Sequence, residues 1–208
     1  MFYFIKMPGW LKKFYPSCTW QIDTEKKIIY LSFDDGPHAE ATPFVLGELK
    51  KYNAKATFFC IGKNVAQQPA IYTRIIEEGH AVGNHTFNHL NGWRTGNDSY
   101  IKNVIAASEL IHSNLFRPPY GKITFKQVKA LGKNSVGLKV IMWTVLSGDF
   151  DNELSNAKCL NNVVKNGGSG SIVVFHDSEK AFSKLQFVLP KVLAHFTDLG
   201  YQFEKIIV

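Results

Sequence analysis

The chain has 208 residues, of which 45% are hydrophobic and 20% charged, and it carries a formal net charge of +7 with a pI near 9.2. This composition is typical of a globular protein, and the length suits one domain with a sizeable core. The basic excess invites an anionic partner, but the lysines are scattered and no nucleic-acid motif accompanies them. We therefore expect no nucleic-acid partner.

The cysteines and the amino terminus argue against several protein classes and cellular locations. The three cysteines, Cys18, Cys60 and Cys159, are odd in number and show no CxxC spacing, which argues against a disulfide framework and a thiolate metal site. Only five apolar residues precede Lys6, too few for a secretory signal or a membrane span. With no signal peptide recognised, the default expectation is a cytoplasmic location. The sequence does not predict an oligomeric state.

Residues 1–26 mix aromatic and basic side chains. Such a segment could touch a membrane surface. We favour the alternative, in which its rings pack against one end of a single domain that spans residues 1–208.

Short apolar runs alternate with longer amphipathic segments along the rest of the chain. Strands are predicted at 27–33, 55–62, 80–85, 138–145, 170–177 and 201–208, and residues 115–121 are a strand end broken by two prolines. Helices are predicted at 41–53, 64–78, 98–115, about 124–133, about 153–166 and 184–198. This alternation predicts an α/β fold with parallel strands inside and helices outside. The number of units favours a barrel or near-barrel over an open sheet.

Unusual polar residues fall where the predicted strands end. In "YLSFDDGP" (30–37), Asp34 and Asp35 end the first strand directly before a Gly-Pro turn. The later strands are followed by His85 and His89, by Arg117 and Tyr120, by Asp149, and by His176 with Asp177. Because the ends of parallel strands meet at one rim, these residues are expected to share a pocket. The alternative for the two acids is ordinary turn chemistry, with one of them capping the next helix.

The histidine pair suggests a metal site. His85 and His89 are four residues apart, so one helical turn would place both imidazoles on one face. Two histidines and a carboxylate from a neighbouring strand end are a common catalytic zinc set, with positions left open for water and substrate. The remaining histidines, His38, His80, His112 and His195, lack such partners and are interpreted as surface or structural residues.

Four motifs, "SFDDGP", "HTFNH", "RPPYG" and "VVFHD", resemble in order and spacing those of the polysaccharide deacetylases, the NodB-homology domain of carbohydrate esterase family four. The resemblance covers about residues 28–207. It implies a distorted (β/α) barrel of about seven parallel strands. It also implies metal-dependent hydrolysis of N-acetyl, sometimes O-acetyl, groups on an acetylated glycan such as peptidoglycan, chitin or xylan. The expected cofactor is a divalent metal, Zn²⁺ first, with Co²⁺ or Mn²⁺ as alternatives.

The resemblance also implies a role for each site residue. Asp35, His85 and His89 would hold the metal, Asp34 would take the proton of the attacking water, and His176 would protonate the departing amine. The substrate-binding or orienting residues would be Arg117, Pro118, Tyr120, Trp143 and Asp149.

Within this second group, the backbone N–H of Tyr120, positioned by the Pro118-Pro119 turn, would stabilise the oxyanion. Arg117 would orient Asp34 through a charge-assisted bond. Asp149 would pair with Arg117 or with His176.

One region departs from the family's usual DxxDW motif. In "WTVLSGDFD" (143–151), Leu146 stands at the first acid and Phe150 at the tryptophan, so only Asp149 matches. We therefore expect a less polar groove wall, and the preferred glycan cannot be copied from other members. Rival interpretations are an O-acetyl esterase or non-glycan amidase on the same site, and a barrel that binds glycan without turnover. Intact Asp34 and His176 argue against the last, because a binder needs neither an acid nor a base.

Overall fold

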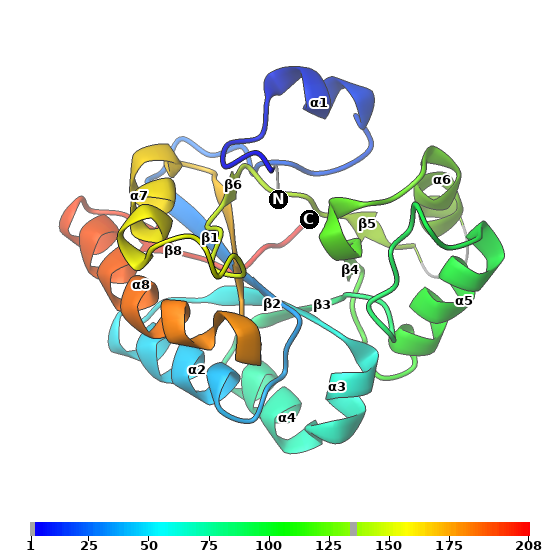
Figure 1. Cartoon of the computed structure of the whole chain (residues 1–208), viewed down its shortest axis with the longest axis horizontal. Coiled ribbons are helices and arrows are strands. Elements are labelled where there is room, and N and C mark those ends of the chain that lie inside the picture. Colours follow the sequence, from blue (N-terminus) through cyan, green and yellow to red (C-terminus); the bar gives the residue numbers. More distant parts are fainter. Residues whose placement is uncertain (1–2, 134–136) are drawn as a thin grey trace.

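A computed structural model describes residues 3–133 and 137–208. Over these residues the strands form one parallel sheet in the order β5-β4-β3-β2-β1-β7-β6, and β8 pairs with β1 beside this path. The strands are β1 (Ile28–Asp34), β2 (Ala56–Cys60), β3 (Ala81–Asn84), β4 (Leu115–Phe116), β5 (Lys139–Val140), β6 (Val145–Leu146), β7 (Ile172–His176) and β8 (Gln202–Phe203). The sheet curls around its axis as an incomplete barrel (Figure 1). The predicted distorted barrel of about seven parallel strands is confirmed.

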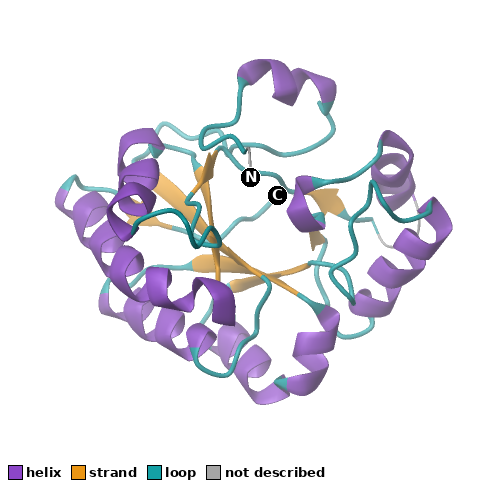
Figure 2. Cartoon of the chain, viewed as in Figure 1, coloured by secondary structure: helices purple, strands orange, loops and turns teal. Residues whose placement is uncertain are grey.

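Helices surround this sheet: most cover its outer face, whereas α1 (Gly9–Phe14) lies beside the opening of the incomplete barrel (Figure 1 and Figure 2). They are α1, α2 (Ala41–Lys51), α3 (Gly62–Gln67), α4 (Pro69–Glu77), α5 (Asn97–Ser108), α6 (Phe125–Lys133), α7 (Asn156–Asn166) and α8 (Glu179–Asp198), with a 3₁₀ turn at Pro119–Gly121. The longest, α8, buries one apolar face that includes Leu185 and Val192. Among the described residues, no helix combines the length and the apolar character needed to cross a membrane.

The central strand β1 explains why the first apolar run of the sequence is continuous rather than alternating. It lies between β2 and β7, and six of its seven residues are buried. A strand of a parallel sheet that is covered on both faces needs apolar side chains on both. Phe33 stacks on Phe58 and Phe175, with ring centroids 5.1 and 6.0 Å apart. This packing fixes the end of β1, where the two adjacent acids stand.

Three predicted helices differ from those observed. The last, predicted at 184–198, already begins at Glu179. The helix predicted at 64–78 is two helices, because Pro69, which has no N–H to donate, begins α4 after α3 has ended at Gln67. The helix predicted at 98–115 ends at Ser108. Beyond it, the backbone N–H of Ile111 still bonds to Ala107, and the Ile111 side chain is buried as the chain turns toward β4.

The strand predicted at 138–145 is interrupted. Its ends are β5 and β6, and the backbone between them bonds elsewhere: the N–H of Met142 donates to the carbonyl of Thr19 at 2.7 Å, and that of Thr144 to Ile172 at 3.0 Å. The amino-terminal segment, residues 3–22, runs along this break. Met7 donates its N–H to Thr144 at 2.9 Å, and Trp20 is buried. The predicted closing strand 201–208 is reduced to β8.

Candidate active site

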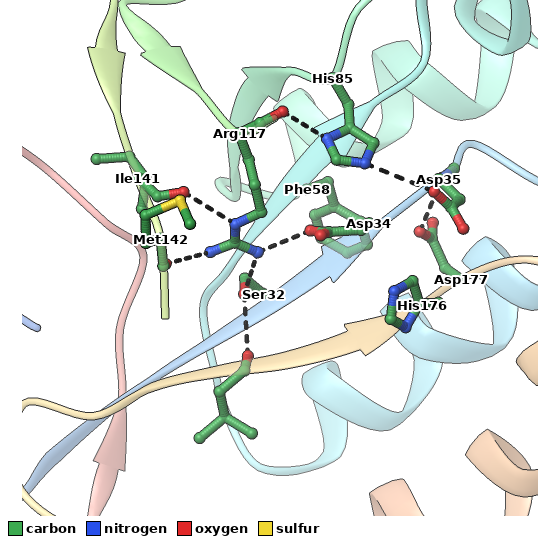
Figure 3. Close-up of polar contacts among 12 residues, drawn as sticks. Ser32, Asp34, Asp35, Phe58, His85, Arg117, Ile141, Met142, His176 and Asp177 are labelled. Atoms are coloured by element: carbon green, nitrogen blue, oxygen red, sulfur yellow. Dashed lines mark hydrogen bonds and ion pairs between the residues drawn. The ribbon is translucent and has the colours of Figure 1, made fainter. Parts of the chain in front are cut away.

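The carboxyl ends of four strands of the parallel sheet, β4, β3, β1 and β7, bring the predicted site residues together (Figure 3). Asp34 ends β1 and lies opposite His176, the last residue of β7, in the parallel register. His85 follows β3 and Arg117 follows β4. The topology therefore gathers residues that are up to about 140 positions apart in the sequence, as the strand-end argument predicted.

The side chains of Asp34 and Asp35 point in different directions because the backbone turns sharply from Asp35 to Pro37. Asp34 is buried, whereas Asp35 has φ 80°, a left-handed conformation that swings its carboxylate to a different side. The turn is held by Asn64, which donates to the Asp35 carbonyl at 2.7 Å, and by Asp177, which accepts from the N–H of Gly36 at 3.1 Å. A Cβ on Gly36 would lie 2.1 Å from the Asp177 carboxylate, so the position requires glycine. The following helix α2 has Glu40 at its N-cap and no side-chain cap, so the capping alternative is wrong.

Asp35, His85 and His89 form a cluster suited to a cation. Their ligand atoms all lie within 4.8 Å of one another, and Asp35 Oδ1 is 3.6 Å from His85 Nε2 and 3.1 Å from His89 Nε2. Oδ1 is buried without a well-oriented hydrogen-bond donor among the described residues. Because a buried carboxylate oxygen needs a donor or a cation, this orphaned atom fits a metal site.

The protonation states in this cluster also suit a metal. His85 Nδ1 lies 2.7 Å from the carbonyl of Arg117, which can only accept, so Nδ1 carries the proton and Nε2 offers its lone pair. Burial lowers the pKa of His85 to about 4, so the ring is neutral at pH 7. Burial would raise the pKa of Asp35, but the imidazoles of His89 and His176 bring it well below its ordinary value. The cluster thus offers a metal the ionised carboxylate of Asp35 and the neutral imidazole nitrogen of His85.

The helical turn predicted for residues 85–89 is wrong. Thr86 and His89 have φ 63° and 56°, and the segment is a loop. Side-chain amides replace the missing helical bonds: Asn84 Oδ1 accepts from the N–H of Thr86 at 2.8 Å, and Asn103 Oδ1 from that of Phe87 at 3.0 Å. The two imidazoles meet because of this loop, with ring centroids 5.1 Å apart, and not because of helical spacing.

Arg117 is buried completely and bonds to several elements at once. It donates from Nη1 to Asp34 Oδ1 and to Ser32 Oγ, both at 2.7 Å. It also donates to the carbonyls of Ile141 at 3.2 Å and Met142 at 3.1 Å. This explains why the predicted fifth strand breaks, since those carbonyls bond to a guanidinium instead of a neighbouring strand. The expectation that Arg117 orients Asp34 agrees with this geometry.

His176 and Asp149 form a second buried pair. One oxygen of Asp149 lies 2.8 Å from His176 Nδ1, and the other accepts the backbone N–H of His176 at 2.7 Å. Burial of the ring lowers the pKa of His176, but the Asp149 carboxylate more than offsets this and raises it to about 10. Of the two partners considered for Asp149, the structure pairs it with His176. The ring of Phe150 lies against His176, edge to face, at 5.3 Å.

Of the remaining predicted residues, Tyr120 borders the cluster and Trp143 lies beside Arg117. Tyr120, after the extended Pro118, has φ 61°, and its exposed ring lies 4.6 Å from that of His89. Trp143 is buried, with its ring 5.9 Å from the Arg117 guanidinium. Leu146 is buried in β6.

Sequence reasoning missed three residues that support the turn and the arginine. Ser32 accepts from Arg117 and donates to the carbonyl of Val173 at 2.9 Å. Thr42 donates to Asp177 at 2.5 Å, and Asn64 holds the Asp35 carbonyl. Ser32 carried a usable signal, because a hydroxyl in the middle of a buried apolar strand needs a partner. The other two stand on helix faces that look ordinary in the sequence.

The chain is similar to known deacetylases that act on glycans. A family model described as polysaccharide deacetylase matches residues 21–140. The chain is 35% identical over 196 residues to a peptidoglycan-N-acetylglucosamine deacetylase of Bacillus cereus, covering 90% of each chain. It is 32% identical over 165 residues to a chitooligosaccharide deacetylase of Azorhizobium caulinodans, covering 76% of this chain and 77% of the other.

Solved structures give the same result. A crystal structure of a peptidoglycan N-acetylglucosamine deacetylase in complex with 4-naphthalen-1-yl-N-oxidanyl-benzamide matches with a TM-score of 0.86 and 30% identity, covering 96% of this chain and 95% of the other. The peptidoglycan deacetylase PdaC from Bacillus subtilis matches with a TM-score of 0.78 and 28% identity, covering 89% and 90%.

Proposed function

The chain belongs to the polysaccharide deacetylase family, and we propose that it removes the N-acetyl group from N-acetylglucosamine units of a peptidoglycan- or chitin-like glycan and releases acetate. The family is metal-dependent. The observation that carries the proposal is the Asp35, His85 and His89 cluster with its orphaned carboxylate oxygen. It stands between a carboxylate held by an arginine and a histidine held by a carboxylate.

The metal would be held by Asp35 Oδ1 and by the imidazole nitrogens of His85 and His89. Carboxylate and imidazole ligands suit Zn²⁺ first, with Co²⁺ and Mn²⁺ as alternatives. When bound, such a cation supplies a Lewis acid that polarises the acetyl carbonyl and acidifies water. Three protein ligands leave coordination positions free for the substrate.

Asp34 is the proposed general base. Its carboxylate is buried and fixed by Arg117 at 2.7 Å. Arginine does not lose its proton in proteins, so the pair keeps Asp34 anionic and ready to take a proton from the attacking water. The neighbouring Asp35 is turned away toward the histidines, which leaves the two acids with different roles.

His176 is the proposed general acid. Asp149 orients its ring through Nδ1 and favours the protonated form, which leaves the Nε2 proton available for the departing amine nitrogen. The backbone N–H of Tyr120, after the Pro118-Pro119 turn, is proposed to donate to the oxyanion of the acetyl carbon. Trp143, beneath Arg117, is proposed to border the bound sugar.

Acetate release from a panel of acetylated substrates tests this proposal. The panel holds N-acetylglucosamine oligomers, peptidoglycan, acetylated xylan and simple acetyl esters, each assayed before and after chelation and after adding back Zn²⁺, Co²⁺ or Mn²⁺. We expect acetate from the N-acetylated glycans, lost on chelation and restored by at least one metal. Release from the esters alone would instead favour the O-acetyl esterase, and no release from any substrate would favour a glycan-binding barrel.

A further inference from the structure

An apolar cavity of about 180 Å³ adjoins the candidate active site. One wall comes from the amino-terminal segment and includes Met7, Leu11 and Trp20, and the other comes from loops at the strand ends and includes Trp93, Tyr120 and Trp143. The family model begins at residue 21, so the first wall lies outside the part of the chain that the model matches. The cavity therefore depends on a segment that the catalytic proposal does not use.

The aromatic walls are held in place before any ligand binds. The indole N–H of Trp20 donates to the carbonyl of Tyr15 at 3.1 Å, and that of Trp93 donates to the carbonyl of Ile123 at 3.0 Å. The Tyr15 hydroxyl donates to the same Ile123 carbonyl at 3.0 Å. Trp143 differs, because its buried Nε1 has no hydrogen-bond partner among the described residues. A ligand oxygen that reached this N–H would satisfy it.

Two of the lining residues connect the cavity to the candidate active site. Tyr120 lines it and also packs on His89, while Trp143 lines it and lies beneath Arg117. No charged side chain is among its described lining residues, which favours a neutral occupant. An apolar cavity of about 150 Å³ holds one six-membered carbon ring. The observed volume thus suits a single ring joined to the group that reacts at the metal site.

We propose that this cavity is a sugar subsite that binds the pyranose ring next to the N-acetylglucosamine unit undergoing deacetylation. The axial C–H bonds of a pyranose make an apolar face that packs on the electron-rich faces of aromatic rings, and its hydroxyl oxygens can accept from an indole N–H. The inference rests on the proposed glycan substrate. It makes the amino-terminal segment a determinant of the oligomer length that the enzyme prefers.

Calorimetric titration with tetra-N-acetylchitotetraose and with monomeric N-acetylglucosamine tests this subsite in Asp34→Asn protein, which binds without turnover. Leu11→Glu places a charge in the cavity wall, and Trp93→Ala removes one aromatic face at a side chain that is 62% exposed. Phe14→Glu is the matched control, because Phe14 lies on the same short helix as Leu11 but outside the cavity. Should Leu11→Glu lower the Tm, Leu11→Ala replaces it.

We expect Leu11→Glu and Trp93→Ala to raise the Kd for the tetramer at least tenfold, with Phe14→Glu within twofold of the parent and the monomer affected by none of them. Unchanged tetramer affinity in both variants, or no binding by the parent, overturns the subsite. A loss confined to Trp93→Ala overturns the role of the amino-terminal segment. Acetate release by the unmutated enzyme is measured separately, so that a failure of the proposed deacetylation can be told from a failure of the subsite.

Discussion

Two buried ion pairs flank Asp35, and they differ in which partner can exchange a proton. On the β1–β4 side, Arg117 lies 2.7 Å from Asp34, and on the β6–β7 side His176 lies 2.8 Å from Asp149. A guanidinium keeps its proton, so the first pair leaves a carboxylate that can accept one. An imidazolium can give its proton away, so the second pair leaves a donor. The same kind of contact would therefore supply the proposed base on one side and the proposed acid on the other.

Substitution of Asp34, the proposed base, should have the largest effect on turnover. Asp34→Asn keeps the shape of the side chain but removes its ability to take a proton, so turnover should fall by roughly two to four orders of magnitude. Acetate release from an N-acetylglucosamine oligomer measures this, and exposed Asp23→Asn is the control, with no change expected. A loss of less than about tenfold would mean that Asp34 is not the base and that the two pairs do not divide the proton transfers.

Substitutions in the pair of His176 and Asp149 should change the pH dependence of kcat. As the proposed general acid, His176 must be protonated, so we expect the rate to fall as pH rises past its pKa, and Asp149→Asn should lower that pKa. We expect the alkaline limb of the kcat profile to move to lower pH while the acid limb stays in place. The positive charge of a bound cation would oppose the effect of Asp149 on the pKa of His176, so we expect the alkaline limb of the unmutated enzyme to lie below pH 10. An alkaline limb that Asp149→Asn and His176→Ala both leave in place would exclude His176 as the general acid.

Arg117 should matter for stability as well as orientation. Arg117→Lys keeps a charge but cannot bond to Ser32, Ile141 and Met142 together. The buried groups left without a donor should cost roughly 1–3 kcal/mol, lowering the Tm by several degrees, and activity should fall about tenfold. The control is Arg74→Lys, because Arg74 forms a partly exposed pair with Glu78. Equal Tm shifts in the two variants would show that the Arg117 network adds nothing to stability.

The smallest effect is expected where the motif departs from the family. Phe150 lies edge to face against His176 at 5.3 Å, in place of the usual tryptophan. Phe150→Trp should change the relative kcat/KM values across the glycan panel by a few-fold and leave bound metal unchanged. Identical preferences on every active substrate would show that this ring does not contribute to the groove.

Much of the site could be predicted from the sequence because strand ends are easy to recognise. The run "YLSFDDGP" places Asp34 and Asp35 at the end of a buried strand, and parallel topology brings His176 beside them. The divergence of the two acids depends on a positive φ at Asp35. Asn64 and other residues distant in sequence hold that conformation. The different directions of the two acids could therefore be predicted only from the family resemblance.

Other features could not be predicted because tertiary contacts override local pattern. The residues between β5 and β6 look like a continuous strand, yet their carbonyls bond to Arg117. The spacing of His85 and His89 suggests a helix, but amide side chains of Asn84 and Asn103 hold a loop. In both cases the deciding partner comes from another part of the chain.

Bound zinc per chain, measured side by side in the unmutated enzyme, Asp34→Asn and Asp35→Asn, tests the division of roles between the adjacent acids most directly. Asp35→Asn removes the anionic ligand from the cluster with His85 and His89. We expect about one ion per chain in the unmutated enzyme and in Asp34→Asn, and much less in Asp35→Asn, whose activity excess zinc should partly restore. Equal loss of zinc in both variants would make Asp34 a ligand too, and full retention in Asp35→Asn would contradict the metal site.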